Sequence, residues 1–83
     1  MDKILVKVIA PAVGESYDLF VPLDVEIGQL TAIIAKGVAD LSSGKYVASG
    51  SELLSRLTPE CLLNPAYTLR QYSVPDGAEL MIL

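Results

Sequence analysis

Apolar positions near the start of the chain predict two strands joined as a hairpin. Residues 4–9 (ILVKVI) are rich in β-branched residues, a composition typical of a strand. Residues 10–16 contain Pro11 and a glycine, which predicts a turn. Residues 17–21 then resume strand character until Pro22, because proline ends a strand or confines it to the edge of a sheet. The turn is too long for a two-residue loop, so turn type does not fix the register.

The next segment carries apolar residues three and four apart, which predicts an amphipathic helix. At about 100° per residue they fall on one stripe about 80° wide, formed by Ile27, Leu30, Ile34, Val38 and Leu41. Asp24 is expected to cap the start through its side-chain oxygen. Gly28 and Gly37 lie inside the helix, and each costs about 1 kcal/mol relative to Ala. Packing should therefore stabilise this helix more than intrinsic propensity does.

The rest of the chain predicts short elements separated by turns. Residues 53–57 and 61–63 are candidate strands on either side of a proline. Residues 68–72 allow one helical turn, residues 75–77 (PDG) predict a tight turn, and residues 78–83 predict a closing strand. The predicted order is strand, strand, helix, then three strands.

Composition argues against catalysis. The chain has 83 residues with no His, no Trp and one Cys, so it lacks a zinc-ligand set, a Ser-His-Asp triad and a Cys-His pair. This length fits a single domain over residues 1–83, with a core of one helix and one sheet. The carboxylates are dispersed without the spacing of a calcium loop. We expect a protein without enzymatic activity, cofactor or metal.

Charge and hydropathy limit the classes of partner that the protein is expected to bind. The formal net charge is −4 with six scattered Lys and Arg residues, so no basic stripe is available for nucleic acid. The lone Cys61 is expected to be a small buried or half-buried filler, and its inability to form an intramolecular disulfide fits a reducing compartment. No secretory leader pattern or 18-residue apolar run occurs, so we expect a cytoplasmic protein without direct membrane insertion. The mean hydropathy of +0.48 indicates exposed apolar surface.

The C-terminal part resembles a known fold. Residues 67–74 (YTLRQYSV), the Asp76-Gly77 turn and the strand that follows resemble the β-grasp fold of ubiquitin, together with the element order of nearly the whole chain. The resemblance implies an α+β fold, with a mixed sheet of four to five strands and one main helix packed on one face. It also implies that the Tyr72 hydroxyl ties down the preceding loop.

A second segment resembles one particular subgroup of ubiquitin-like proteins. Residues 17–30 (YDLFVPLDVEIGQL) resemble YukD and EsaB, bacterial ubiquitin-like proteins that are cytoplasmic accessory components of type VII (WXG100, ESX-like) secretion systems. They also resemble the ubiquitin-like domain fused to membrane proteins of the mycobacterial system. The implied function is non-catalytic protein binding, with the cytoplasmic parts of membrane secretion-machinery proteins as partners.

Other functions remain possible for a protein with this fold. A ubiquitin-like modifier or a sulfur carrier such as ThiS or MoaD needs a flexible Gly-Gly carboxylate beyond the last strand. The given sequence stops at Leu83 within the predicted strand, so we expect neither conjugation nor sulfur transfer unless a longer reading frame restores that tail. A non-catalytic subunit of a multicomponent enzyme is another alternative, and self-association as a homodimer is a third.

Strand parity predicts the binding surface. If Val6 and its alternate neighbours face the helix, the residues between them face the opposite side of the sheet. Parity is ambiguous in the third strand, where placing Leu53 and Leu57 inside puts Leu54 outside. With the strand order that the resemblance implies, the predicted protein-binding band consists of Leu5, Ile9, Phe20, Leu54, Met81 and Leu83. Contiguous apolar side chains on an uncovered face usually mark a binding site, although strands also favour apolar residues that nearby lysines cover.

Overall fold

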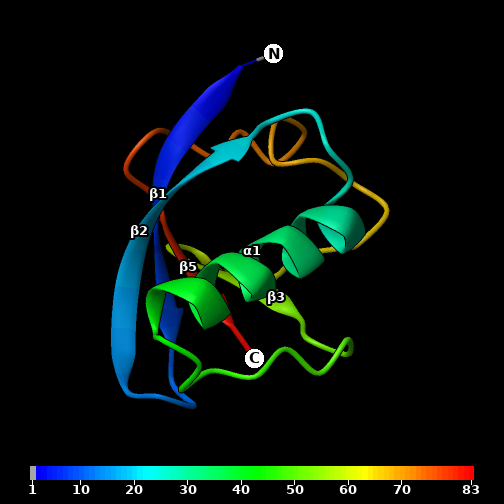
Figure 1. Ribbon diagram of the computed structural model, residues 1–83. Helices are drawn as coiled ribbons and strands as arrows, with labels where there is room; N and C mark the ends of the chain where they lie inside the picture. Colours follow the sequence, from blue (N-terminus) through cyan, green and yellow to red (C-terminus); the bar gives the residue numbers. More distant parts are fainter. Residues whose placement is uncertain (1) are drawn as a thin grey trace.

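One helix lies across one face of a five-stranded mixed sheet in the computed structural model, which describes residues 2–83 (Figure 1). The elements are β1 (Lys3–Ala10), β2 (Glu15–Pro22), α1 (Ile27–Leu41), β3 (Leu54–Leu57), β4 (Glu60–Leu62) and β5 (Glu79–Ile82). The strands run in the order β2-β1-β5-β3-β4, in which β1 and β5 are parallel and the other neighbours are antiparallel. This arrangement confirms the predicted α+β architecture.

The core lies between α1 and the inner face of the sheet. In β1 the β-branched residues alternate, so Ile4, Val6 and Val8 point inward and are buried. The parallel pairing of β1 with β5 sets Val8 beside Leu80, which is also buried. The predicted parity of β1, β2 and β5 is therefore confirmed. The helix contributes Ile27, Leu30, Thr31, Ile34, Ala35 and Val38 to this core.

The predicted helical stripe is wrong at its last member. Leu41 is 53% exposed, although it falls on the same angular stripe as the buried residues. Leu41 is the last residue of the helix. Thr31 and Ala35, which lie on the opposite side of the predicted stripe from Leu41, are buried. The side of α1 that packs is therefore shifted from the predicted stripe toward these smaller residues.

The prediction for β3 is also wrong, and it changes the candidate surface. Leu54 is only 1% exposed, because β3 pairs with β5 in a register that sets Leu54 opposite the core residue Ile82. Side chains directly opposite each other in a sheet share a face. Leu54 therefore belongs to the core, and its neighbour Leu53 is 46% exposed.

Backbone carbonyls of a distant loop, and not the predicted Asp24 side chain, satisfy the start of α1. The N-cap residue is Glu26, and no side chain caps the helix. The Ile27 N–H donates to the Tyr67 carbonyl over 2.8 Å, and the Gly28 N–H donates to the Pro65 carbonyl over 2.9 Å. These bonds satisfy amide groups that a helix leaves unpaired at its first turn.

The Asp24 carboxylate instead accepts hydrogen bonds from the Arg70 guanidinium. Arg70 Nε lies 2.6 Å from Asp24 Oδ1, and Arg70 Nη2 lies 2.7 Å from Asp2 Oδ2. Hydrogen bonding to Arg70 lowers the pKa of Asp24 below its ordinary value. The pair joins the segment before α1 to the segment before β5.

Tyr72 holds the loop that supplies those carbonyls. Its hydroxyl accepts a hydrogen bond from the Asn64 N–H over 2.9 Å, which confirms the role expected from the sequence. The Arg56 guanidinium lies 5.5 Å from the centre of the Tyr72 ring, and Arg56 Nη1 donates to the Tyr72 carbonyl over 2.9 Å. Arg56 of β3 and Tyr72 therefore fix the loop against the sheet.

The reassignment of Leu54 gives a direct test. Leu54→Ala is expected to lower the free energy of unfolding by about 2–5 kcal/mol, because it removes buried side-chain volume from the core. The adjacent Leu53→Ala should lower it by less than about 1 kcal/mol, because that side chain is partly in water. Chemical denaturation followed by circular dichroism measures both. Equal losses for the two variants would contradict the observed register of β3.

Candidate protein-binding surface

The face of the sheet opposite α1 has no second layer over it. Outward-pointing residues of adjacent strands meet there in rows that the strand pairing sets. In β1 these residues are Leu5, Lys7 and Ile9, the alternates of the buried set. Among residues 2–83, no helix or strand covers these side chains (Figure 1), so this face is the candidate surface.

One apolar patch lies at the junction of β1 and β2. Leu5 lies directly opposite Phe20, and because the Leu5 backbone bonds toward the β5 side, the two residues form a non-hydrogen-bonded pair. Side chains approach most closely in such pairs. Phe20 is 73% exposed and Leu5 is half-buried. We call these two residues the Phe20 patch.

A second and larger apolar patch crosses the sheet. Ile9 pairs with Met81, Met81 pairs with Ser55, and Ser55 pairs with Leu62, so one row spans β1, β5, β3 and β4. Leu53 and Leu83 extend it, because their backbones exchange hydrogen bonds of 3.1 and 2.9 Å. We call this the Met81 patch, consisting of Ile9, Leu53, Leu62, Met81 and Leu83.

A row of charged residues separates the two patches. Lys7 lies opposite Asp18 on one side and beside Glu79 on the other. This row runs between the Leu5–Phe20 pair and the Ile9–Met81 pair. The single apolar band predicted from the sequence is therefore divided, and a partner would meet a charged row between two apolar areas.

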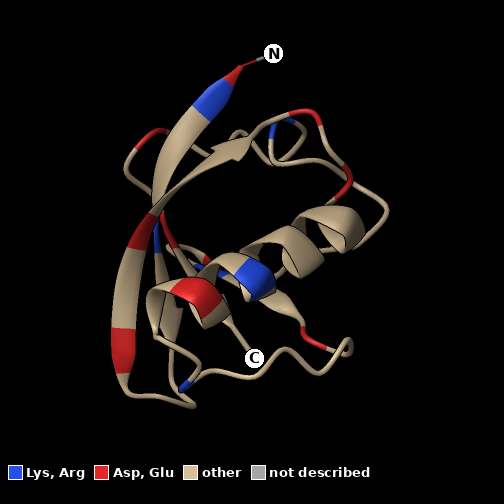
Figure 2. Cartoon of the chain, in the orientation of Figure 1, with Lys and Arg blue, Asp and Glu red and all other residues tan. Residues whose placement is uncertain are grey.

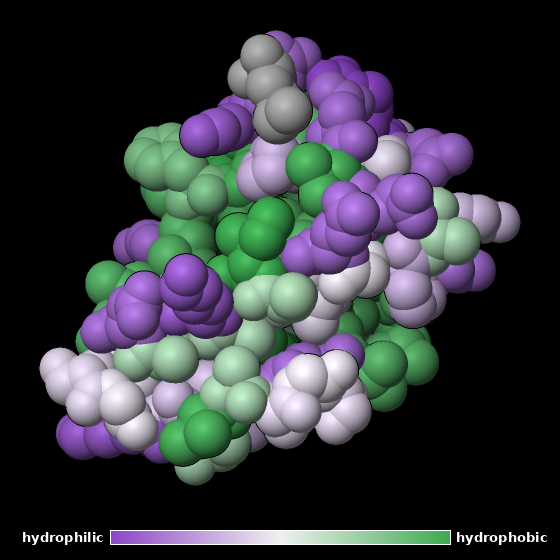
Figure 3. Space-filling view, turned by 45° about the vertical axis from the view of Figure 1, so that its right-hand side comes forward, coloured by the Kyte–Doolittle hydropathy of each residue, from purple (hydrophilic) through white to green (hydrophobic). Residues whose placement is uncertain are grey.

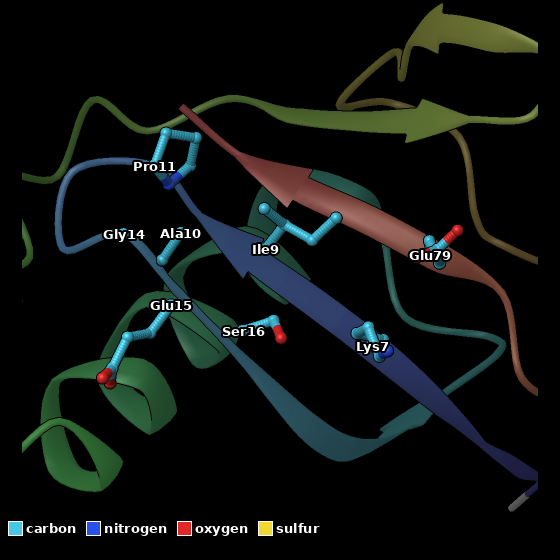
Figure 4. A pocket seen from close by; sticks show the side chains of 8 residues that line it. All are labelled: Lys7, Ile9, Ala10, Pro11, Gly14, Glu15, Ser16 and Glu79. Carbon is cyan, nitrogen blue, oxygen red and sulfur yellow. The ribbon is translucent and has the colours of Figure 1, made fainter.

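A shallow hollow opens at the hairpin end of this face. Its volume is about 520 Å³, and Figure 4 shows Ile9 near its middle with Lys7 and Glu79 toward one end. The lining consists of Lys7, Ile9, Ala10, Pro11, Gly14, Glu15, Ser16 and Glu79. Its apolar centre and charged rim suit a side chain of a partner, because a small apolar depression gives a protruding residue a place to bury.

The predicted site residues fall into two groups. Leu5, Ile9, Phe20, Met81 and Leu83 lie on the open face, whereas Leu54 lies in the core. The sequence reasoning missed Leu53 and Leu62, which are 46% and 56% exposed. These two residues lie on the open face because β3 pairs with β4 and β5. No local sequence pattern predicts that pairing. The binding role of the whole set stays a prediction.

The side of the molecule that carries α1 has a less continuous apolar surface than the open face of the sheet. In the space-filling view (Figure 3), apolar groups on that side are interrupted by charged and polar ones. The exposed large apolar residues of the helix are Ile33 and Leu41, each 53% exposed. The open sheet face carries the larger apolar set that the strand register brings together.

Features that would suggest other chemistry are few in the described part of the chain. Residues 2–83 contain no group of three or more His, Cys, Asp or Glu side chains placed to hold a metal ion. None of their helices is long and apolar enough to cross a membrane. Cys61 is half-buried, and its thiol donates to the Leu62 carbonyl over 3.4 Å. Its half-buried placement confirms the expectation from the sequence.

One hydrogen-bonded tyrosine stands out electrostatically. Burial raises the pKa of Tyr46 to about 12, and the hydrogen bond from its hydroxyl to Glu52 (3.1 Å) adds to the rise. The Glu52 carboxylate also accepts the N–H groups of Ser49 and Gly50. Its bond from Ser49 is the largest cause of a lowered Glu52 pKa. These contacts organise the loop between α1 and β3.

Solved structures resemble this chain, whereas no family model and no curated protein matches it. The ubiquitin-like domain of the Mycobacterium tuberculosis type VII secretion system protein ECCD1 has a TM-score of 0.67 at 18% identity, covering 100% of this chain and 99% of that one. A ubiquitin-like domain of an Arabidopsis thaliana protein has a TM-score of 0.68 at 15% identity, covering 100% and 78%. Caldiarchaeum subterraneum ubiquitin has a TM-score of 0.66 at 18% identity, covering 98% and 91%.

The chain has the ubiquitin-like β-grasp fold. The strand order, the single helix and the overlap over nearly the whole chain agree on this point. At these identities the likeness concerns the fold, and a fold alone does not determine a function.

The buried tyrosine predicts an alkaline transition. Because the folded pKa of Tyr46 lies above the ordinary value of 10.0, its contribution to stability is fully present below pH 10 and is lost as the pH rises toward about 12. Tyrosine absorbance should show a late-ionising phase that Tyr46→Phe removes. The exposed control Tyr67→Phe should leave this phase in place. A late phase that persists in Tyr46→Phe would contradict the assignment.

Proposed function

We propose that this ubiquitin-like domain is a non-catalytic protein-binding module that acts as a cytoplasmic accessory component of a type VII secretion system. The observation that carries the proposal is the uncovered sheet face with its two apolar patches. Side chains that lie contiguously on an open face lose water when a partner covers them, which stabilises the complex. A binding role also fits the sequence, which offers no set of residues for catalysis.

The geometry supports docking by apolar burial with polar orientation. A partner would bury its apolar side chains on the Met81 patch, whose half-buried Ile9 and Met81 are held in place by the sheet. The charged row of Asp18, Lys7 and Glu79 would then set the orientation of the partner. Charges at the margin of an interface act mainly on specificity and association rate.

Support for the secretion assignment is of two kinds. Residues 17–30 resemble the YukD and EsaB segment that enters the helix. The fold covers the same span as the ubiquitin-like domain of ECCD1, which is named as a type VII secretion system protein. The partners we propose are the cytoplasmic parts of the membrane proteins of such a machine.

The Met81 patch provides the test. Leu62 is 56% exposed on this patch, and Val47 is 79% exposed in the loop between α1 and β3. Leu62→Asp should weaken binding to the purified cytoplasmic domains of the type VII membrane components by about tenfold or more, because it places a charge in an apolar contact. Val47→Asp is the matched control and should bind as the unaltered chain does. Isothermal titration calorimetry measures both.

Two results would count against the proposal. They are failure of the unaltered chain to bind any of these domains, and equal binding by the two folded variants. Thermal unfolding of each variant shows whether Leu62→Asp is folded; an unfolded variant does not enter the comparison. Met81→Asp, in the middle of the same patch, then serves as the second variant.

A further inference from the structure

The β2 strand forms a long and uncovered edge of the sheet. It spans Glu15–Pro22 and pairs with β1 along its whole length without a bulge. Within residues 2–83 its other side pairs with no strand, and in Figure 1 no strand lies beyond it. The opposite edge, β4, has only three residues. A long strand edge with unpaired backbone groups is the part of a sheet that accepts an additional strand.

The backbone of β1 shows which groups of β2 point outward. The Leu5 N–H donates to Asp76 Oδ1 over 2.7 Å, the Leu5 carbonyl accepts from Gly77, and the Lys7 N–H donates to the Ala78 carbonyl over 2.9 Å. Leu5 and Lys7 thus use their backbone groups on the β5 side. Their partners across the hairpin form non-hydrogen-bonded pairs, so those partners direct their own N–H and C=O groups to the free edge.

The outward set is therefore Ser16, Asp18 and Phe20. Leu5 pairs with Phe20, Lys7 with Asp18 and Ile9 with Ser16, and Ile9 lies in the same parallel ladder with β5 as Lys7. Within residues 2–83, no hydrogen bond reaches the backbone N–H or C=O groups of these three residues. They form an alternating template of donors and acceptors along one edge.

The charge along this edge has one sign. β2 contains Glu15 and Asp18 but no Lys or Arg, and Figure 2 shows acidic and neutral segments along it without a basic one. Ion pairs within residues 2–83 join Arg70 to Asp2 and to Asp24 and leave Asp18 out. Lys7 on the neighbouring strand lies opposite Asp18 without forming an ion pair with it. The edge thus presents a carboxylate that a cationic side chain could bind.

The helix gives the inner side of the edge an apolar flank. A Cβ placed on Gly37 would lie 3.6 Å from Leu19 Cδ1, so α1 faces β2 at this point. Ile33 and Leu41 lie one turn before and one turn after Gly37, on the same side of the helix. Each is 53% exposed. The inward side chains of an added strand would have these residues to pack against.

We propose that the β2 edge binds an extended polypeptide segment with alternating basic and apolar residues. Its Lys or Arg side chains would face Asp18 on the open side, and its apolar side chains would face Leu19 and the helix flank. Backbone groups of the segment would bond to Ser16, Asp18 and Phe20. This site is separate from the Met81 patch, so the proposal does not rest on the function proposed above.

A second copy of the chain is the less suitable occupant. Antiparallel pairing of two β2 edges about Asp18 would set the two Asp18 carboxylates opposite each other. Like charges directly opposite in a sheet are destabilising. The other registers still bring the acidic residues of both strands into one seam without a basic residue of β2 to offset them. A basic segment removes this repulsion.

The test uses a capped eight-residue peptide of alternating Val and Lys with the full 83-residue chain. Alternation places all lysines on one face of the added strand and all valines on the other. Binding should protect the amides of Ser16, Asp18 and Phe20 from hydrogen exchange. Asp18→Asn should raise the Kd about tenfold, the size expected from one charge-assisted contact. A peptide of alternating Val and Glu should bind at least ten times more weakly than the Val-Lys peptide.

A proline variant isolates the backbone contribution. The N–H of Ser16 points away from β1, so Ser16→Pro removes an outward donor without removing a β1–β2 hydrogen bond. It should abolish peptide binding, and the matched control Ser16→Ala should keep it. Circular dichroism checks that Ser16→Pro is folded; if it is not, Asp18→Asn and the amide protection of the unaltered chain decide the question.

Several outcomes would overturn the proposal. One is no binding of the Val-Lys peptide at millimolar concentration, and another is equal binding of the Val-Glu peptide. A third is protection of the same amides by concentration-dependent dimerisation without peptide, which analytical ultracentrifugation detects. Retention of peptide binding by Leu62→Asp is expected here, so failure of this proposal and failure of the proposed function are distinguishable.

Discussion

In the part of the chain that the structure describes, a single helix has to provide the whole second layer of the fold. α1 covers one side of the sheet, so the side chains of β1 divide into a buried set and an uncovered set. Val6 and Val8 are completely buried, whereas Leu5 and Ile9 between them are half-buried. Both candidate interaction sites follow from this arrangement. Within residues 2–83, the open face exists because no second helix covers it, and β2 is free along one side because the sheet ends there.

The sequence was most informative where alternation is strong and one face is buried. The β-branched run of β1 could slip by one residue only by moving its entire apolar set out of the core, so its parity was predictable. β3 offered no such constraint, because Leu53 and Leu54 are adjacent and either could face inward. The choice is made by Ile82, which lies opposite Leu54 from a strand distant in sequence.

Local rules also failed where a distant residue competed for the same group. Asp24 has the chemistry of a helix cap, but Arg70 binds its carboxylate and loop carbonyls satisfy the helix amides. The candidate surface shows the same limit. Its apolar residues could be read from the chain, whereas their division by Lys7 and Glu79 depends on the parallel register of β1 with β5. Such registers are products of the assembled sheet.

The loop around Pro65 and Tyr67 determines which end of α1 unfolds first. It holds the first amides of α1, and Tyr72 holds it in turn through Asn64. Loosening this loop would therefore release the beginning of the helix in the same event. The far end of α1 has only short-range bonds of this kind, because its cap residue Ser42 bonds to the carbonyls of Val38 and Ala39 and accepts the Tyr46 N–H, all within four residues. Thermal fraying should thus start at the Leu41 end, while the Ile27 end opens only in larger and rarer cooperative fluctuations.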